Sequence, residues 1–262
     1  MALTDTFGSY QNEIGRACAD GRQSVLRMKD DVPRMINDMK KTYSRVITDM
    51  SEVTVSHKLV IEIFAWSSAL VLVNSIGSIL GAYILHPIIG NFFGKFTASL
   101  CAYFFIPVLC HSGIKRRQRN FESENSIRMM MVIVAAVQGL LAGFAINHRY
   151  LAAQPIAFLT PVSLSFGYAG IVDQARRNRV KILGASLGAA LAMNLILGAL
   201  FDLLTLSYMF LTLGYIAIGG ITMQLVFDRC HDTSGLVYQN VLCSLFVLFK
   251  GLTFHLFGTY IE

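Results

Sequence analysis

Polar side chains interrupt the apolar stretches of this chain, and they are the residues whose chemistry matters most at membrane depth. They can hydrogen-bond between helices, or they can line a polar path for water or ions. Asn240 and Ser244 are four residues apart and are predicted to share one helix face. Both interpretations stay open for the whole set, which comprises Asn74, Ser75, Ser78, Asn194, Thr222, Gln224, Asn240 and Ser244, with Lys250 nearby in the last stretch.

Other chemistry is missing from these stretches. No carboxylate lies deep within them, which argues against ordinary proton-driven transport. No nucleophile and base fall together, so we expect no enzyme and no catalytic residue. The five cysteines form no CxxC pair and the six histidines show no ligand spacing, so we expect no metal, no cofactor and no disulfide framework.

The composition is that of a membrane protein. Of 262 residues, 54% are hydrophobic and only 15% are charged, and the mean hydropathy is +0.55. A soluble enzyme, a disulfide-rich secreted domain and a nucleic-acid binder are therefore excluded. Residues 1–62 are rich in charge and are predicted to be a cytosolic helical head, whereas residues 63–262 are predicted to be a transmembrane helix bundle.

Apolar runs long enough to cross a bilayer core of about 30 Å define the predicted spans. An all-α fold of six to seven transmembrane helices is expected. The seven candidate segments are Ile63–Leu85, Ile88–Cys110, Met129–Ile146, Ile156–Val172, Ile182–Leu204, Tyr208–Phe227 and Leu236–Phe257.

Loop charges predict the orientation. Nineteen Lys and Arg residues fall in the head or in loops on its side, against Lys95 and Arg149 on the other side. Since basic residues accumulate on the cytosolic side, the N-terminus is predicted to be cytosolic. The last segment contains Lys250 and either crosses or re-enters. No signal peptide is expected, because about 60 polar residues precede the first apolar run.

Two further patterns bear on packing. Small residues four apart are expected to pack helices closely, in the pairs Gly77 and Gly81, Gly139 and Gly143, and Gly184 and Gly188. In the head, an amphipathic helix is predicted from the spacing of Val32, Met35, Ile36, Met39, Tyr43, Val46, Ile47 and Met50. That helix would either cover the loops or dock on a membrane or a partner.

The C-terminal half resembles the transmembrane Bax inhibitor motif family. The similar stretches are the basic loop and following span Gln174–Leu187, the segment Leu213–Arg229 with its Gln-Leu-Val-Phe-Asp-Arg ending, and Phe246–Leu252. The resemblance implies six helices around a central seventh, a location in the endoplasmic reticulum or another endomembrane, and a role in calcium leak and in restraining cell death.

The resemblance also implies a site. The aspartate pair of that family falls on Thr222 and Ser244, which become a candidate polar or ion path. A second acidic position falls on Asn240, which is a neighbour of this path together with Gln224, Lys250 and Asn194. Because Thr and Ser cannot ionise, we expect pH-gated calcium conduction to be weakened or lost.

Three functions compete at this stage. The first is a divergent Bax-inhibitor-like regulator of cell death and calcium homeostasis. The second is a non-conducting membrane scaffold or adaptor that recruits a partner through the N-terminal head. The third is a small-molecule permeator that uses the polar residues. The expected partners are membrane lipids and proteins at the head and basic loops, with calcium left open and no nucleic acid.

Overall fold

The computed structural model describes residues 41, 44–46, 48–229 and 233–260. Contacts divide the chain into two units, Met1–Asp49 and Met50–Glu262. In the first unit the described residues up to Thr48 are helical, and the Thr48 hydroxyl donates a hydrogen bond to the Ser44 carbonyl oxygen at 2.8 Å. Most of the predicted amphipathic helix lies outside the described residues, and the predicted boundary after residue 62 stays a prediction.

The second unit is built almost entirely of helices, which confirms the predicted all-α class. Its only strands in the described ranges, β1 and β2, form a short antiparallel pair in which Arg149 faces Tyr260. In chain order the elements are α2 (His57–Ile79), the π-helical turn η1 (Leu80–Ile84), α3 (His86–Gly90), α4 (Lys95–Leu100), the π-helical turn η2 (Cys101–Phe105), α5 (Ile106–Arg119), α6 (Glu124–Ile146), β1 (Arg149–Tyr150), α7 (Leu159–Ile171), α8 (Arg179–Leu200), α9 (Leu206–Arg229), α10 (Gly235–Phe257) and β2 (Thr259–Tyr260).

Six helical stretches in the described part of the chain are long and apolar enough to cross a membrane. They correspond to six of the seven predicted segments. Their bounds are His57–Ile84, Lys95–Arg119, Glu124–Ile146, Arg179–Leu200, Leu206–Arg229 and Gly235–Phe257.

The segment predicted at Ile156–Val172 is different. Only Leu159–Ile171 is helical there, and these 13 residues cover about 20 Å along the axis, less than a bilayer core of about 30 Å. Residues 156–158 are not helical, so the helix starts three residues later than predicted. Pro155, just before them, restricts the preceding residue, Gln154, to extended conformations. An irregular segment at residues 151–158 therefore leads into α7.

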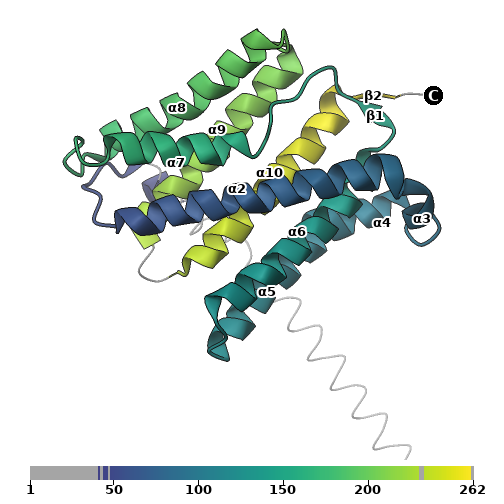
Figure 1. Ribbon diagram of the computed structural model, residues 1–262, viewed down its shortest axis with the longest axis horizontal. Coiled ribbons are helices and arrows are strands. Elements are labelled where there is room, and N and C mark those ends of the chain that lie inside the picture. Colours follow the sequence, from purple (N-terminus) through teal and green to yellow (C-terminus); the bar gives the residue numbers. More distant parts are fainter. Residues whose placement is uncertain (1–40, 42–43, 47, 230–232, 261–262) are drawn as a thin grey trace, which may run out of the picture. The chain divides into compact units, whose positions relative to one another are not determined.

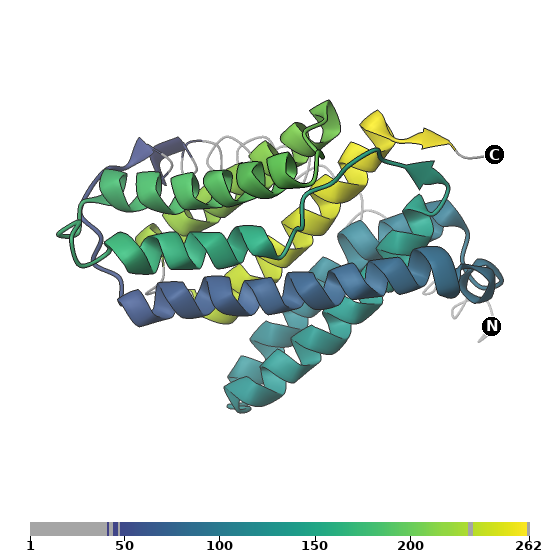
Figure 2. The ribbon, with the colours of Figure 1, turned by 45° about the horizontal axis from the view of Figure 1, so that its top comes forward.

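Two central helices lie between two groups of helices (Figures 1 and 2). The helix α2 packs against α6 on one side and α7 on the other, and α10 packs against α2, α5, α6 and α9. In Figure 1 the green group is α7, α8 and α9, and the teal group is α4, α5 and α6. Aromatic stacking joins α9 to α10, with the rings of Tyr215 and Phe246 4.4 Å apart between centroids.

Side-chain caps fix where three of the long helices begin. The Ser123 hydroxyl accepts a hydrogen bond from the Ser126 amide at the start of α6, and Asn178 accepts one from the Lys181 amide at the start of α8. The Ser234 hydroxyl does the same at the start of α10. Such residues satisfy amide groups that have no partner within the first turn of a helix.

Two of the three predicted small-residue pairs make a close crossing between α2 with η1 and α6. A Cβ atom on Gly139 or Gly143 would overlap the backbone of Asn74 or Ser78, and Gly77 and Gly81 meet the backbone of α6 in the same way. The packing prediction is confirmed for these pairs. It is wrong for Gly184 and Gly188, because a Cβ at either position would meet no atom within 4 Å.

Candidate functional site

Thr222 and Ser244, the positions singled out by the family resemblance, do not bond to each other. The buried Thr222 hydroxyl donates a hydrogen bond to the Ile218 carbonyl oxygen of its own helix at 2.8 Å. The Ser244 hydroxyl is buried and has no hydrogen-bond partner. Thr222 is thus satisfied within α9, while Ser244 is the unsatisfied member of the two.

Ser244 and Asn240 share a face of α10, as their spacing predicted, and that face lines a cavity of about 270 Å³. The cavity lies between α10 and α5, and its other walls include Tyr103, Pro107 and His111. The Asn240 side-chain amide donates to the Pro107 carbonyl oxygen at 3.4 Å. Thr222 and Gln224 do not line this cavity, so the structure does not bring the predicted polar residues into one path.

Asn194 holds two neighbouring helices together. Its side-chain nitrogen donates to the Thr160 hydroxyl on α7 at 3.2 Å and to the Ala190 carbonyl oxygen at 2.9 Å. Its own carbonyl oxygen accepts a hydrogen bond from the Tyr208 hydroxyl at 2.7 Å. Asn74 has a similar role, because it donates to the Ala135 carbonyl oxygen on α6 at 3.1 Å. These contacts favour the packing interpretation for both asparagines.

Gln224 belongs to a buried cluster at the start of α8. The Arg179 guanidinium donates to the Gln224 side-chain oxygen at 2.5 Å and to the Gln224 carbonyl oxygen at 3.2 Å. Arg179 is only 2% exposed and lies over the Phe227 ring at 5.5 Å. Arg179, which the sequence placed in the basic loop and following span Gln174–Leu187, is therefore part of the core.

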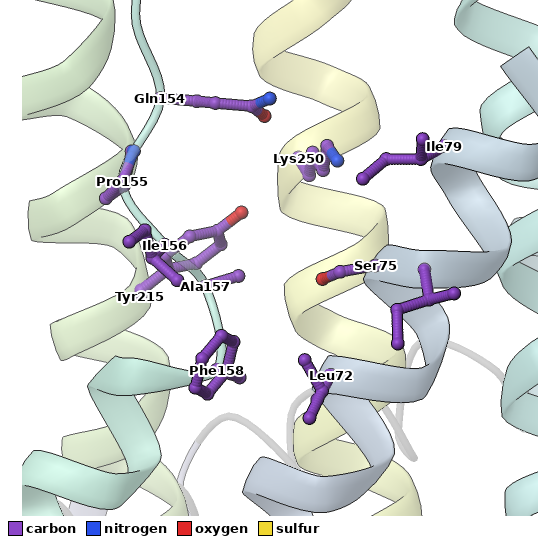
Figure 3. Close-up of a pocket in the computed structure, with 11 residues that line it drawn as sticks. Leu72, Ser75, Ile79, Gln154, Pro155, Ile156, Ala157, Phe158, Tyr215 and Lys250 are labelled. Atoms are coloured by element: carbon purple, nitrogen blue, oxygen red, sulfur yellow. The ribbon is translucent and has the colours of Figure 1, made fainter. Parts of the chain in front are cut away.

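Lys250 lines a different cavity, of about 340 Å³, on the other side of α10 (Figure 3). One wall is the irregular segment before α7, from which Gln154 extends towards α10. A second wall is α2, which contributes Ser75 and Ile79, and Tyr215 on α9 closes the cavity. This cavity exists because the chain does not continue α7 as a helix through residues 151–158.

Hydroxyl groups compensate for the irregular backbone of this wall. Ser68 on α2 donates to the Phe158 carbonyl oxygen at 3.1 Å, and Ser207 on α9 donates to the Ala153 carbonyl oxygen at 3.3 Å. Non-helical backbone is tolerated at membrane depth only where protein or a polar cavity satisfies it. The two serines and the cavity meet that condition.

A second, smaller cavity of about 70 Å³ adjoins the first and shares Ile79, Gln154 and Lys250 with it. Arg149 and Asn147 also line it. Sequence reasoning missed Gln154 and Arg149 as members of a site. The Gln154-Pro155 pair was the available signal, since a proline directly before a predicted span restricts the residue that precedes it to extended conformations.

The two cations at these cavities have no acidic partner within the described ranges. No carboxylate there lies within 4 Å of the Lys250 amine or the Arg149 guanidinium. Arg149 donates instead to the carbonyl oxygens of Phe254 and His255, at 3.3 and 3.0 Å. Lys250 lies over the Phe254 ring at 5.8 Å. Over the same ranges, no three His, Cys, Asp or Glu residues lie close enough together to hold a metal ion.

One end of the second unit gathers the starts of several helices. His57 at the start of α2 lies 2.8 Å from the Tyr168 hydroxyl near the end of α7. Arg128, near the start of α6, forms an ion pair with Glu62 on α2. The basic loop between α7 and α8 lies at this end, and the last turn of α5 carries Arg116, Arg117 and Arg119.

The loop between α7 and α8 has an unusual backbone. Arg176 and Arg177 both have positive φ angles, 46° and 63°, a conformation that costs a non-glycine residue of order 1–3 kcal/mol. The Val53 amide holds the loop by donating to the Arg177 carbonyl oxygen at 3.0 Å. Both arginine side chains are exposed.

These features define a class of protein: an all-helical chain with six helices in its described part that are long and apolar enough to cross a membrane. The chain belongs to the family described as "Interactor of ZYG-11", whose model matches residues 5–260. No curated protein and no solved structure matches it.

The family assignment corrects the predicted resemblance. The chain is not identified as a Bax inhibitor motif protein, and the implied roles in cell death and calcium homeostasis are wrong with it. So is the alternative of a non-conducting scaffold or adaptor that acts through the head. The resemblance rested on short basic loops followed by apolar helices, and such patterns are common to membrane proteins because insertion itself requires them.

Proposed function

We propose that this chain is a multi-pass membrane protein that binds ZYG-11 as its protein partner. The observation that carries the proposal is the family match, which extends over residues 5–260 and so includes all six apolar helices. The region shared with the family therefore includes the six apolar helices as well as the loops between them. In this proposal the helices form a bundle around α10, with α2, α5, α6 and α9 as its neighbours.

The proposed orientation puts the N-terminus and the start of α2 in the cytosol. The charge asymmetry between loops supports it, since Lys and Arg collect on the cytosolic side. Lys115, Arg116, Arg117 and Arg119 lie in the last turns of one apolar helix. Arg176 and Arg177 precede another, and Lys181 lies in its first turn. The endoplasmic reticulum was implied only by the Bax inhibitor resemblance, so the proposal names no organelle.

Within this orientation, the loop between α7 and α8 is the proposed contact for ZYG-11. Arg176 and Arg177 are exposed and adjacent, and hydrogen bonds at both ends of the turn fix their backbone. A rigid, positively charged loop loses little conformational entropy on binding, and it suits a partner surface that carries acidic side chains.

The test is a binding measurement with purified ZYG-11 and the full chain in lipid nanodiscs. The double variant Arg176→Glu and Arg177→Glu is expected to weaken binding by about tenfold or more, because it replaces attraction with repulsion. The variant Lys95→Glu is the matched control, since Lys95 is exposed and starts α4 at the other end of the unit.

Each result has a definite meaning. Unchanged binding by the double variant would exclude the α7–α8 loop as the contact. Absence of binding by the unmodified chain would overturn the function itself. Equal weakening by Lys95→Glu would also count against the loop, because it would indicate a general effect of charge.

A further inference from the structure

The two cavities beside Lys250 adjoin each other, since Ile79, Gln154 and Lys250 line both, and together they make a compartment with a polar end and an apolar end. The smaller cavity, of about 70 Å³, holds the polar end, where Lys250, Arg149, Asn147 and Gln154 meet. It is roughly the size of two water molecules, so it admits a small charged group. The larger cavity, of about 340 Å³, extends from there along α2.

The polar end carries an uncompensated positive charge. Lys250 and Arg149 line the same small cavity, and no carboxylate in the described part of the chain pairs with either. Two like charges in a weakly solvated site repel each other, and an anion would relieve that repulsion.

The apolar end opens along an exposed helix face. Leu72, Ile76 and Ile79 line the larger cavity from α2, and the side chains of Ile76 and Ile79 are 51% and 58% exposed. Because α2 is one of the helices able to cross a membrane, this opening would face acyl chains. Pro155, Ile156 and Ala157 form the opposite wall.

We propose that this compartment binds an acidic phospholipid, with the phosphate in the smaller cavity beside Lys250 and Arg149 and an acyl chain in the larger cavity along α2. The charge complementarity identifies the headgroup as an anion, and the apolar wall identifies an attached chain. The Gln154 side chain borders both cavities and is placed to donate a hydrogen bond to the phosphate.

The position of Lys250 along its helix agrees with this ligand. Lys250 lies about two turns before the end of α10 at Phe257, roughly 10 Å along the axis. A lysine at that depth extends its amine towards the membrane surface, where lipid phosphates lie. The bound phosphate would belong to the leaflet at the end opposite the start of α2.

Native mass spectrometry of the full chain in mild detergent tests the proposal, with thermal unfolding as a second measurement. The probes are phosphatidic acid, phosphatidylcholine and inorganic phosphate. The unmodified chain is expected to retain phosphatidic acid and to unfold at a higher temperature with it, because a ligand that binds only the folded state stabilises that state. Phosphatidylcholine and inorganic phosphate are each expected to bind about tenfold more weakly.

Three variants separate the roles of charge and position. Lys250→Gln is expected to weaken retention of phosphatidic acid by about tenfold or more, since it removes a cation from a weakly solvated site. Lys250→Arg keeps the charge and is expected to keep binding. Lys95→Gln removes an exposed cation that lines neither cavity, and it is expected to change nothing.

Equal retention of phosphatidic acid and phosphatidylcholine would overturn the proposal, as would undiminished binding by Lys250→Gln. Inorganic phosphate bound as tightly as phosphatidic acid would overturn the lipid assignment, because the acyl chain would then contribute nothing. If Lys250→Gln does not fold, Gln154→Ala replaces it, with a weaker loss of affinity expected. The test is independent of ZYG-11, whose binding these variants are expected to leave intact.

Discussion

The Arg179 guanidinium donates a hydrogen bond to the Gln224 side-chain oxygen at 2.5 Å, although the two residues are 45 positions apart in the chain. This bond connects the first residue of α8 to the last two turns of α9. A second bond from Arg179 reaches the Gln224 backbone at 3.2 Å, and the Phe227 ring covers the guanidinium. Loss of any one of these partners is expected to lower the stability of the fold, because the buried guanidinium charge is then less well compensated.

Gln224→Leu is expected to lower the free energy of unfolding by about 2 kcal/mol, because a hydrogen bond to a charged group is lost while the charge stays buried. Equilibrium unfolding in mixed detergent micelles measures this. Arg177→Gln, at an exposed loop residue close by, is the control and is expected to stay within about 0.5 kcal/mol. A Gln224→Leu protein as stable as the control would show that the bond contributes little.

The glycines at the α2–α6 crossing give a second prediction. Gly143→Ala is expected to cost about 1–3 kcal/mol, because the added methyl group meets the backbone at Ser78 and the helices must separate. Gly184→Ala makes the same chemical change in another apolar helix, where the added methyl group has open space. It is expected to be neutral or slightly stabilising, since Ala favours the helix.

Thermal unfolding of the two glycine variants side by side checks this prediction. Both substitutions raise helix propensity equally, so the comparison isolates the effect of the close approach. Similar unfolding temperatures for Gly143→Ala and Gly184→Ala would contradict the crossing.

The proposed orientation gives a third prediction. In a chain whose five cysteines are replaced by serine, Arg176→Cys is expected to react with a membrane-impermeant maleimide only after the membrane is permeabilised, because its loop would be cytosolic. Lys95→Cys, at the other end, is expected to react in intact vesicles that expose the non-cytosolic face. The opposite labelling pattern would reverse the topology.

Hydropathy predicted six of the long helices correctly because lipid leaves the backbone no other hydrogen-bond partner than its own helix. The same reasoning was wrong at Ile156–Val172, where the composition is apolar but only Leu159–Ile171 is helical. Side-chain hydroxyls of Ser68 and Ser207, far away in the sequence, satisfy that backbone instead. A scan along the sequence cannot detect such partners.

The candidate site was less predictable than the fold. Hydropathy measures how apolar a segment is, but not which neighbour each face meets. Gly139 and Gly184 illustrate this, because both begin small-residue pairs and only the first meets another backbone. Lys250 was recognised as unusual, but its relation to Arg149 and Gln154 depends on an irregular segment whose route the sequence does not specify.

The close crossing of α2 and α6 also constrains how the molecule can move. Backbone lies against backbone at Gly139 and Gly143, and Asn74 on α2 also bonds to the backbone of α6, so these two helices have little room to slide past each other. The opposite wall of the Lys250 compartment has no such close backbone contact: it is a short length of non-helical chain joined to α7, to which Ser68 and Ser207 each donate one hydrogen bond. If the compartment takes up a lipid as proposed, its opening would widen by displacement of residues 151–158, while α2 and α6 keep their positions.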